Sequence, residues 1–277
     1  MKNLITRALT GIVFVVVLAG SICWHPLSYL ALFALITGLS LWEFQGLLNQ
    51  HEGTHLKRII GCLGGVYLFA ATFGYAYGLA SSHIFLPYLL FLMYLFFRVL
   101  YHKEDNPINA WAYALWGQVY CAGSFSLLNF IASQRVGLDS AHYSPLFILA
   151  IFVCIWLNDT GAYLVGSLIG KHRLFERISP KKSWEGFFGG MFFAMAVSQL
   201  FAWYEPAISR WSWLGLSAVI VAAGTWGDLV ESLLKRTLQV KDSGKLLPGH
   251  GGMLDRFDSV IFAIPAAYLY IEWFIRN

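Results

Sequence analysis

The chain has 277 residues, of which 58% are hydrophobic and 12% are charged. Soluble domains carry about 25% charged residues, so this composition excludes an ordinary soluble protein and indicates an integral membrane protein. The formal net charge of +4 does not predict a nucleic-acid partner, because Lys and Arg in a membrane protein mainly report which loops face the cytoplasm. Each of the four cysteines stands alone in an apolar stretch, which predicts small buried side chains.

The hydrophobic segments predict an all-α, polytopic membrane protein. A membrane helix needs about 20 mostly apolar residues to cross roughly 30 Å of hydrocarbon. The first apolar run resembles a signal peptide, but it is long and another run follows after a short break, so we expect a retained membrane helix. In chain order, about nine membrane helices are predicted, at residues 8–24, 27–48, 59–80, 84–101, 109–132, 144–170, 187–204, 211–234 and 259–275.

These helices are expected to form one continuous membrane domain with two parts. Residues 1–140 hold about five of the helices and no motif that carries chemistry, whereas residues 141–277 hold the charged motifs. Glycines cluster at 61–65 and 186–190, and small residues in membrane helices predict close helix packing rather than chemistry.

The distribution of basic residues predicts the orientation in the membrane. If the N-terminus is cytoplasmic, all of the 19 Lys and Arg residues except Arg135, Arg210 and Arg276 fall on the cytoplasmic side. We therefore expect a multi-pass protein of the inner (cytoplasmic) membrane with the N-terminus in and the C-terminus out. This arrangement puts the charged loops 171–186 and 235–258 on the same face, where a polar active site is expected.

The end of the segment at 211–234 carries polar residues spaced for one face of a helix. Asp228, Glu231, Ser232 and Lys235 recur at i, i+3, i+4 and i+7. A carboxylate at the edge of an apolar segment is costly unless it faces a polar cavity and has a partner. An intrahelical salt bridge from Lys235 to Asp228 is the simplest alternative to a functional role.

The loop that follows is rich in Gly and Pro, and it leads into the last predicted helix. Gly251 and Gly252 expose backbone N–H groups to which an anion can bind, and Asp255 and Asp258 stand three residues apart where the helix should begin. Helix capping explains one such Asp, but it does not explain these two together with Asp228 among several cations. Carboxylate oxygens suit Mg²⁺ and the cations suit phosphate, so the pattern predicts a metal-dependent phosphate site. A structural ion-pair network is the alternative.

A second polar stretch interrupts and follows the segment at 144–170. Asn158 and Asp159 fall within apolar sequence, and polar residues at membrane depth are functional candidates by default. A hydrogen-bonded helix contact is the alternative. The next loop carries Ser179, Lys181 and Lys182, which predicts either a basic loop near anionic lipid or a cradle for a triphosphate or a lipid phosphate.

The stretch 232–258 resembles the signature of the phosphatidate cytidylyltransferases, also called CDP-diacylglycerol synthases. The resemblance covers about the C-terminal 120 residues, and residues 1–140 match only as generic membrane helices. Three positions depart from the usual pattern: Asn158 stands where Ala is often expected, Ser183 replaces Thr, and Gln239 occupies a position where Gly is common. The signature positions that match are Ser232, Lys235, Arg236, Lys241, Asp242, Gly244, Leu247, Pro248, His250, Gly251, Gly252, Asp255, Arg256 and Asp258.

The resemblance implies transfer of the cytidylyl group of CTP to phosphatidic acid, giving CDP-diacylglycerol and pyrophosphate. It implies that Asp228 and Asp255 bind Mg²⁺, and it suggests a second cation such as K⁺. The expected partners are CTP, phosphatidic acid and the lipid bilayer, with a homodimer left open. The residues expected to be catalytic are Asp228, Asp255, Lys235, Arg256 and Asp258, and those expected to bind substrate are Asn158, Asp159, Ser179, Lys181, Lys182, Ser232, Arg236, Lys241, Asp242, His250, Gly251 and Gly252.

Two other functions are compatible with parts of the pattern. The same chemistry could act on another lipid phosphate, such as an ether-linked phosphatidate analogue or a polyprenyl phosphate. An ion-coupled transporter also carries intramembrane acids, but it would show paired broken helices in its two halves. In this chain the ionisable residues concentrate in the C-terminal half, which disfavours a transporter.

Overall fold

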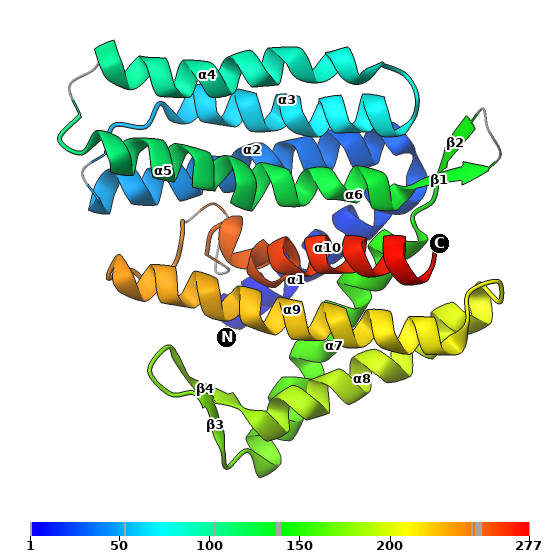
Figure 1. The fold of residues 1–277 in the computed structure, drawn as a ribbon. Coiled ribbons are helices and arrows are strands. Elements are labelled where there is room, and N and C mark those ends of the chain that lie inside the picture. The colour runs from blue at the N-terminus through cyan, green and yellow to red at the C-terminus, as the bar shows by residue number, and fades with distance from the viewer. Residues whose placement is uncertain are drawn as a thin grey trace. The chain divides into compact units, whose positions relative to one another are not determined.

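A computed structural model describes residues 2–52, 54–101, 104–136, 140–244, 246 and 251–276, and it confirms an all-α, polytopic membrane protein (Figure 1). The chain forms two compact units. The first comprises Met1–Ser144 with Leu238–Arg256, and the second comprises Pro145–Thr237 with Phe257–Asn277. The predicted division at residues 140 and 141, into helices without and with motifs, stays a prediction.

Among the described residues, seven helices are long and apolar enough to cross a membrane. Two predicted helices are not in this set. The described apolar part of the first, Thr10–Trp24, is too short, and the one at 109–132 is divided by a π-helical segment. The count of nine therefore stays a prediction. The seven spans are Pro26–Gln50, Arg58–Ala76, Ser82–Tyr101, Leu146–Ile169, Trp184–Tyr204, Arg210–Thr237 and Leu254–Phe274.

The first unit is a bundle of helices with one short hairpin. In the hairpin, β1 pairs antiparallel with β2, with Ser133 opposite Tyr143. The π-helical segment η2 continues directly from α5 into α6. The elements are α1 (Lys2–Trp24), α2 (Pro26–His51), α3 (Arg58–Ala76), η1 (Ser82–Phe85), α4 (Leu86–Tyr101), α5 (Pro107–Gly117), η2 (Gln118–Gly123), α6 (Ser124–Ala132), β1 (Ser133–Val136) and β2 (Ser140–Tyr143).

Glycine and buried polar contacts hold the helices of the first unit together. A Cβ atom at Gly65 of α3 would collide with Leu41 of α2, so the glycine allows these helices to approach closely, as predicted for 61–65. Tyr29 of α2 donates a hydrogen bond to Asn129 Oδ1 (3.0 Å), and Asn129 Nδ2 donates to Thr72 Oγ1 of α3 (2.8 Å). These buried polar groups satisfy one another, which fixes the contacts of α2, α3 and α6.

The second unit consists of four helices and a hairpin that was not predicted. The strands β3 and β4 pair antiparallel, with Arg173 opposite Ser183 and Phe175 opposite Ser179, in a segment that the sequence predicted only as a charged loop. Helix α10 takes its first three residues from the first unit. The elements are α7 (Leu146–Ile169), β3 (Arg173–Phe175), β4 (Ser179–Ser183), α8 (Trp184–Tyr204), α9 (Arg210–Thr237) and α10 (Leu254–Phe274).

Helices α7 and α8 pack at glycine contacts. A Cβ atom at Gly186 of α8 would lie 2.9 Å from the carbonyl oxygen of Ala162, and one at Gly161 of α7 would lie 3.1 Å from Gly190 Cα. The prediction that the glycines at 186–190 serve helix packing is therefore confirmed. Large apolar side chains such as Phe192 of α8 point outward, as expected of a lipid-facing surface.

Candidate functional site

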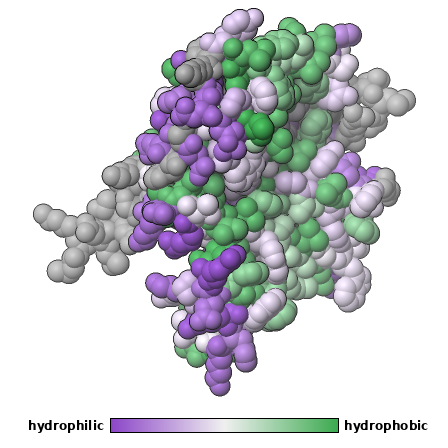
Figure 2. All heavy atoms as spheres, turned by 60° about the vertical axis from the view of Figure 1, so that its left-hand side comes forward, coloured by the Kyte–Doolittle hydropathy of each residue, from purple (hydrophilic) through white to green (hydrophobic). Residues whose placement is uncertain are grey.

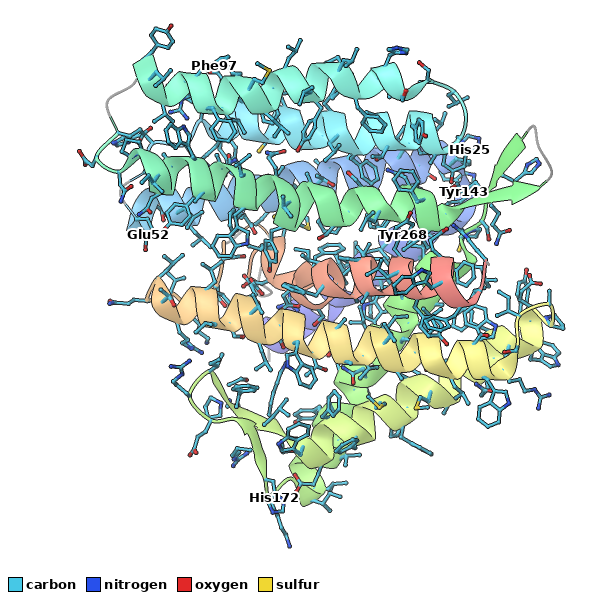
Figure 3. All side chains as sticks on the ribbon, viewed as in Figure 1. His25, Glu52, Phe97, Tyr143, His172 and Tyr268 are labelled. Carbon is cyan, nitrogen blue, oxygen red and sulfur yellow. The ribbon has the colours of Figure 1, made fainter. Side chains whose placement is uncertain are left out.

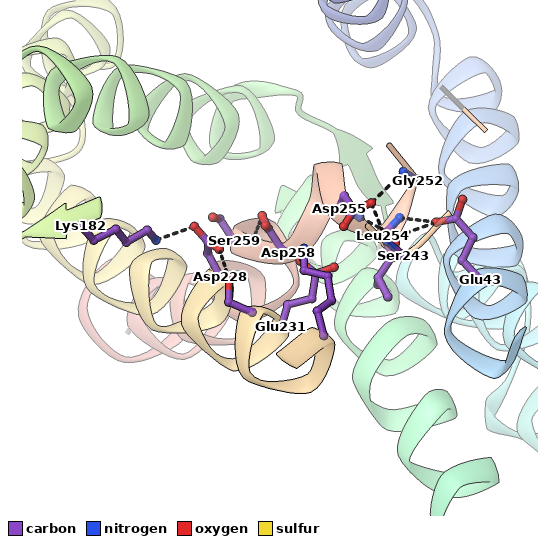
Figure 4. Close-up of polar contacts among 12 residues, drawn as sticks. Glu43, Lys182, Asp228, Glu231, Ser243, Gly252, Leu254, Asp255, Asp258 and Ser259 are labelled. Carbon is purple, nitrogen blue, oxygen red and sulfur yellow. Dashed lines mark hydrogen bonds and ion pairs between the residues drawn. The ribbon is translucent and has the colours of Figure 1, made fainter. Parts of the chain in front are cut away.

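The predicted polar residues of α9 lie on one helical face, and Asp228 is the first of them in chain order (Figure 4). Ser232 Oγ donates a hydrogen bond to Asp228 Oδ1 (3.1 Å), and Lys182 of β4 forms an ion pair with Asp228 Oδ2. One turn further along, Lys235 Nζ lies 3.4 Å from Glu231 Oε2. Asp228 therefore does not depend on Lys235 alone for a partner, because a lysine from another charged loop neutralises it.

Gly227 allows α10 to approach this face of α9. A Cβ atom at Gly227 would lie 2.8 Å from the carbonyl oxygen of Asp258, whereas one at Gly224 would lie at an ordinary contact distance, 3.5 Å, from Ser259. The close approach puts the Asp258 carboxylate beside Glu231 and within electrostatic reach of Asp228. Gly227 thus allows the contact, and the next residue, Asp228, supplies an acid to it.

The β3–β4 hairpin carries the basic residues and is anchored at its base by Glu185. The carboxylate of Glu185 accepts hydrogen bonds from the backbone N–H groups of Lys171 (3.1 Å) and His172 (3.2 Å), and it lies 2.6 Å from His172 Nδ1. Figure 3 labels His172 at this end of the hairpin. Hydrophilic residues gather over this hairpin, at the bottom of the view in Figure 2. The anchored base holds β4 in place, and Lys182 extends from β4 to Asp228.

The second unit contains a cavity of about 230 Å³ that brings together four of the predicted residues. Asp159 is exposed, whereas Asn158 is buried with its Oδ1 against Gly190 of α8. Among the described residues, Asn158 Oδ1 has no hydrogen-bond partner, so the alternative of a hydrogen-bonded helix contact is not realised through this atom. Ser179 is not among the lining residues. The predicted residues in the lining are Asn158, Asp159, Lys181 and Lys182, and their neighbours there include Ser183, Thr225 and Ser259.

In the first unit, Asp255 organises the loop of the signature. Its Oδ2 accepts hydrogen bonds from the backbone N–H groups of Ser243 (2.8 Å) and Gly252 (2.8 Å). The Asp255 N–H donates in turn to Ser243 Oγ (3.2 Å). Gly251 has a φ of +83°, a conformation that favours glycine. The Gly252 N–H was expected to bind an anion, and in the structure it donates to the carboxylate of Asp255 in the same chain.

Sequence reasoning missed Glu43 of α2. This carboxylate is 8% exposed, and its Oε2 accepts hydrogen bonds from the Leu254 N–H (2.9 Å) and from Ser243 Oγ (3.2 Å) (Figure 4). The signal that could have found it is plain: Glu43 is a single acid inside an otherwise apolar segment, and such a residue is a functional candidate by default.

Glu43 also lines a cavity of about 650 Å³ in the first unit, together with the predicted residues Lys241 and Asp242. Arg58 lies on the wall of this cavity with its guanidinium 3.7 Å from the centre of the Trp42 ring. Arg58 Nε donates a hydrogen bond to the Trp42 carbonyl oxygen (3.0 Å). The cavity therefore holds two cations and two carboxylates on an aromatic wall.

The remaining predicted residues have simple placements. Arg236 is exposed in the last turn of α9, and Arg256 is exposed in the first turn of α10. His250 lies outside the described residues. Asp228 and Asp255 belong to different units, so their joint coordination of one ion stays a prediction.

The oxygen donors fit a magnesium ion. Among the described residues, no group of three or more His, Cys, Asp or Glu side chains could hold a metal ion by itself. Mg²⁺ needs only one or two carboxylates, because water and substrate phosphate complete its octahedron. Asp228 already bears a cation, the Lys182 ammonium, and the Ser232 hydroxyl adds a second oxygen beside it.

The chain is similar to known cytidylyltransferases over nearly its whole length. A sequence model described as the Cytidylyltransferase family matches residues 5–274. A protein of Staphylococcus haemolyticus (strain JCSC1435) named phosphatidate cytidylyltransferase is 36% identical over 239 residues, which cover 85% of this chain and 87% of that protein.

Other relatives match more strongly over a shorter stretch. A phosphatidate cytidylyltransferase of Staphylococcus aureus (strain COL) is 48% identical over 139 residues, or 50% of this chain and 52% of that protein. One of Staphylococcus epidermidis (strain ATCC 12228 / FDA PCI 1200) is 48% identical over 120 residues, or 43% of this chain and 46% of that protein. In these alignments the chain spans about half the length of the relatives that it matches.

Proposed function

Because this chain belongs to the cytidylyltransferase family, we propose that it transfers the cytidylyl group of CTP to phosphatidic acid, giving CDP-diacylglycerol and pyrophosphate in phospholipid biosynthesis. The observation that carries the proposal is the ion pair between Lys182 and Asp228. It joins two charged stretches of sequence that were each singled out as phosphate sites. An ion-pair network with a purely structural role would not require residues from both stretches to line one polar cavity.

The reaction needs little covalent chemistry from side chains. An oxygen of the lipid phosphate attacks the α-phosphorus of CTP, a new P–O bond forms, and the bond from the α-phosphorus to the bridging oxygen breaks as pyrophosphate leaves. Both reactants are anions, so the protein has to neutralise their repulsion and hold them in line. The absence of a Ser–His nucleophile pair in the sequence agrees with such a mechanism.

Mg²⁺ dependence is part of the proposal. We expect Asp228 and Asp255 to hold the ion, with a second cation such as K⁺ sharing the site. When bound, Mg²⁺ neutralises the charge of the phosphate oxygens. The chain's own residues then orient the reactants, because Asp228 is fixed by Ser232 and Asp255 is fixed by two backbone N–H groups.

The basic residues supply the rest of the charge balance. Lys181 and Lys182 line the cavity of the second unit, and Lys241 lines the cavity of the first. Preorganised cations stabilise the charge that develops on phosphate oxygens more than water does, because they need no reorganisation. We expect these lysines, with Arg236 and Arg256, to bind the triphosphate, the leaving pyrophosphate and the lipid phosphate.

The decisive experiment uses purified protein with radiolabelled CTP, phosphatidic acid and Mg²⁺. The expected result is a lipid-soluble cytidine product and an equal amount of pyrophosphate, both lost on addition of a chelator. Parallel reactions with an ether-linked analogue and with a polyprenyl phosphate test the lipid. If another lipid phosphate is turned over and phosphatidic acid is not, the substrate is wrong. If no lipid yields product, the proposed function is wrong.

A further inference from the structure

An acid from the N-terminal half of the chain contacts the signature at its described residues 243–244 and 252–254. Leu254 is the first residue of α10, so its N–H has no partner within the helix. Glu43 Oε2 accepts that hydrogen bond at 2.9 Å, from a position 211 residues earlier in the chain. A carboxylate also interacts favourably with the positive end of a helix dipole. Glu43 therefore caps α10 from α2.

The same oxygen of Glu43 orients Ser243. A carboxylate can only accept, so the Ser243 hydroxyl donates its proton to Glu43 Oε2 (3.2 Å). The hydroxyl oxygen then accepts from the Asp255 N–H (3.2 Å), and the Ser243 N–H donates to Asp255 Oδ2 (2.8 Å). The Ser243 hydroxyl thus connects Glu43 to the backbone N–H of Asp255, the residue expected to bind Mg²⁺.

Two glycines of the signature are explained by this carboxylate. A Cβ atom at Gly244 would come closer than 3.0 Å to Glu43 Oε1, and one at Gly252 would come equally close to Glu43 Oε2. Neither glycine has a positive φ, so backbone conformation does not demand them. At Gly244 the atoms in the way all belong to Glu43, whereas at Gly252 they also include Ser243 Oγ and the backbone nitrogen of Gly244. A side chain at either position would therefore displace Glu43 from the contacts that it makes here.

We propose that Glu43 is a positioning residue for the signature loop. Its two hydrogen bonds hold the Leu254 N–H and the Ser243 hydroxyl. Lys241 and Asp242 directly precede Ser243 and line, with Glu43, the 650 Å³ cavity. For its effect on turnover, this inference rests on the proposed cytidylyl transfer. It assigns a task to the N-terminal helices, which carry no motif in the sequence.

The substitutions that test this role separate hydrogen bonding from side-chain volume. Both observed bonds converge on Oε2, so Glu43→Gln keeps an acceptor at that position, whereas Glu43→Leu fills the same space with no acceptor. We expect Glu43→Leu to lower kcat about 100-fold, the scale expected when catalytic groups shift by about 1 Å, and Glu43→Gln to restore most of it. The control is Glu52→Gln, an exposed acid at the C-cap of α2 that accepts from Tyr113.

Amide hydrogen exchange provides a readout that does not depend on activity. In Glu43→Leu we expect exchange at least tenfold faster at residues 251–255 and at Ser243, and unchanged exchange in α9. Glu43→Gln and Glu52→Gln should match the parent protein. Because the local amides are followed directly, this arm decides the positioning role even if the protein turns over no phosphatidic acid.

The opposite results are equally clear. Parent-like exchange at residues 251–255 in Glu43→Leu would overturn the proposal, and so would faster exchange throughout α2 and α3, which indicates general destabilisation. Ser243→Ala provides a second variant that leaves Glu43 in place. Because both residues act through one hydrogen-bond chain, the double variant should be no slower than Glu43→Leu alone. Additive losses would show that the two residues act independently.

Discussion

Gln239 adopts a left-handed backbone conformation, with φ of 57°, two residues after α9 ends. A left-handed residue at this position closes a helix C-terminus, and glycine adopts it without a steric penalty. The usual pattern has Gly at this position, and the structure explains why. Because Gln239 stands where the pattern usually has Gly, its backbone at this turn is strained.

The substitution Gln239→Gly should stabilise the protein by about 1 kcal/mol, because it removes the cost of a left-handed side-chain-bearing residue. The measurement is thermal unfolding in detergent. Thr237→Gly is the control, since Thr237 is helical and glycine there should destabilise. If both glycines lower the midpoint, the strain at Gln239 has no energetic consequence.

Asp228 and Lys182 should behave as one unit in catalysis. We expect Asp228→Asn and Lys182→Met each to lower cytidylyl transfer by about 100-fold, because each leaves a partly buried charge without its partner. The double variant should lose little more than either single variant. Formation of the lipid-soluble cytidine product is the measurement, with Glu272→Gln, an exposed acid of α10, as control. Parent-like turnover in Asp228→Asn would contradict the assigned role.

At the scale of elements, the crossing of α9 and α10 depends on one glycine more than on its neighbour. A Cβ at Gly227 would lie 2.8 Å from both the Asp258 carbonyl oxygen and Phe262 Cβ, whereas at Gly224 the nearest atoms are at 3.5 Å, an ordinary contact. The two positions differ by less than one helical turn. They therefore form a matched pair for testing how closely these helices must approach.

We expect Gly227→Ala to destabilise the protein by about 1–3 kcal/mol, the range typical of overpacking, and to reduce turnover by displacing Asp258 from the α9 face. Gly224→Ala should be close to neutral. Thermal unfolding in detergent and product formation measure both effects. Equal stability of the two variants would indicate that α10 shifts freely and that the tight contact is not needed.

One feature at the scale of elements, a π-helical segment, could not be predicted from the hydrophobic pattern of the sequence. The predicted helix at 109–132 contains the π-helical segment η2, where Gln118 Nε2 donates to the Gly61 carbonyl oxygen of α3 (2.9 Å). Tyr88 of α4 lies on the other side of this amide and donates to its oxygen (3.3 Å). Partners more than 25 residues away determine this local change in helix geometry, so periodicity within the segment cannot reveal it.

At the scale of the whole molecule, the basic residues predict that the β3–β4 hairpin is cytoplasmic and that the loop between α8 and α9 lies on the opposite side. We expect Glu176→Cys to react with a membrane-impermeant maleimide only after right-side-out vesicles are opened, and Ala207→Cys to react in closed vesicles. Both positions are exposed. Cys23 is exposed, so the prediction of a buried side chain was wrong for this cysteine, and it must first be replaced by Ser. The reverse labelling pattern would invert the topology.

The sequence alone determined the fold class and the family resemblance, and it supplied the list of residues expected at the site. The composition indicates a membrane protein, because a surface this apolar has to face lipid. The signature indicates a functional site, because charged residues within apolar sequence are costly unless they have a function. These properties depend on residue type and spacing along the chain. They need no knowledge of which segments meet.

Only the tertiary structure decided which distant residues of the chain contact one another. Lys182 is 46 residues from Asp228, and Glu43 is 211 residues from Leu254, so no local spacing could pair them. The sequence does not show why residues 244 and 252 of the signature are glycines, whereas in the structure the Glu43 carboxylate lies against both. Hydrogen bonds and ion pairs act over a few ångströms in space, and folding alone determines which distant residues come within that range.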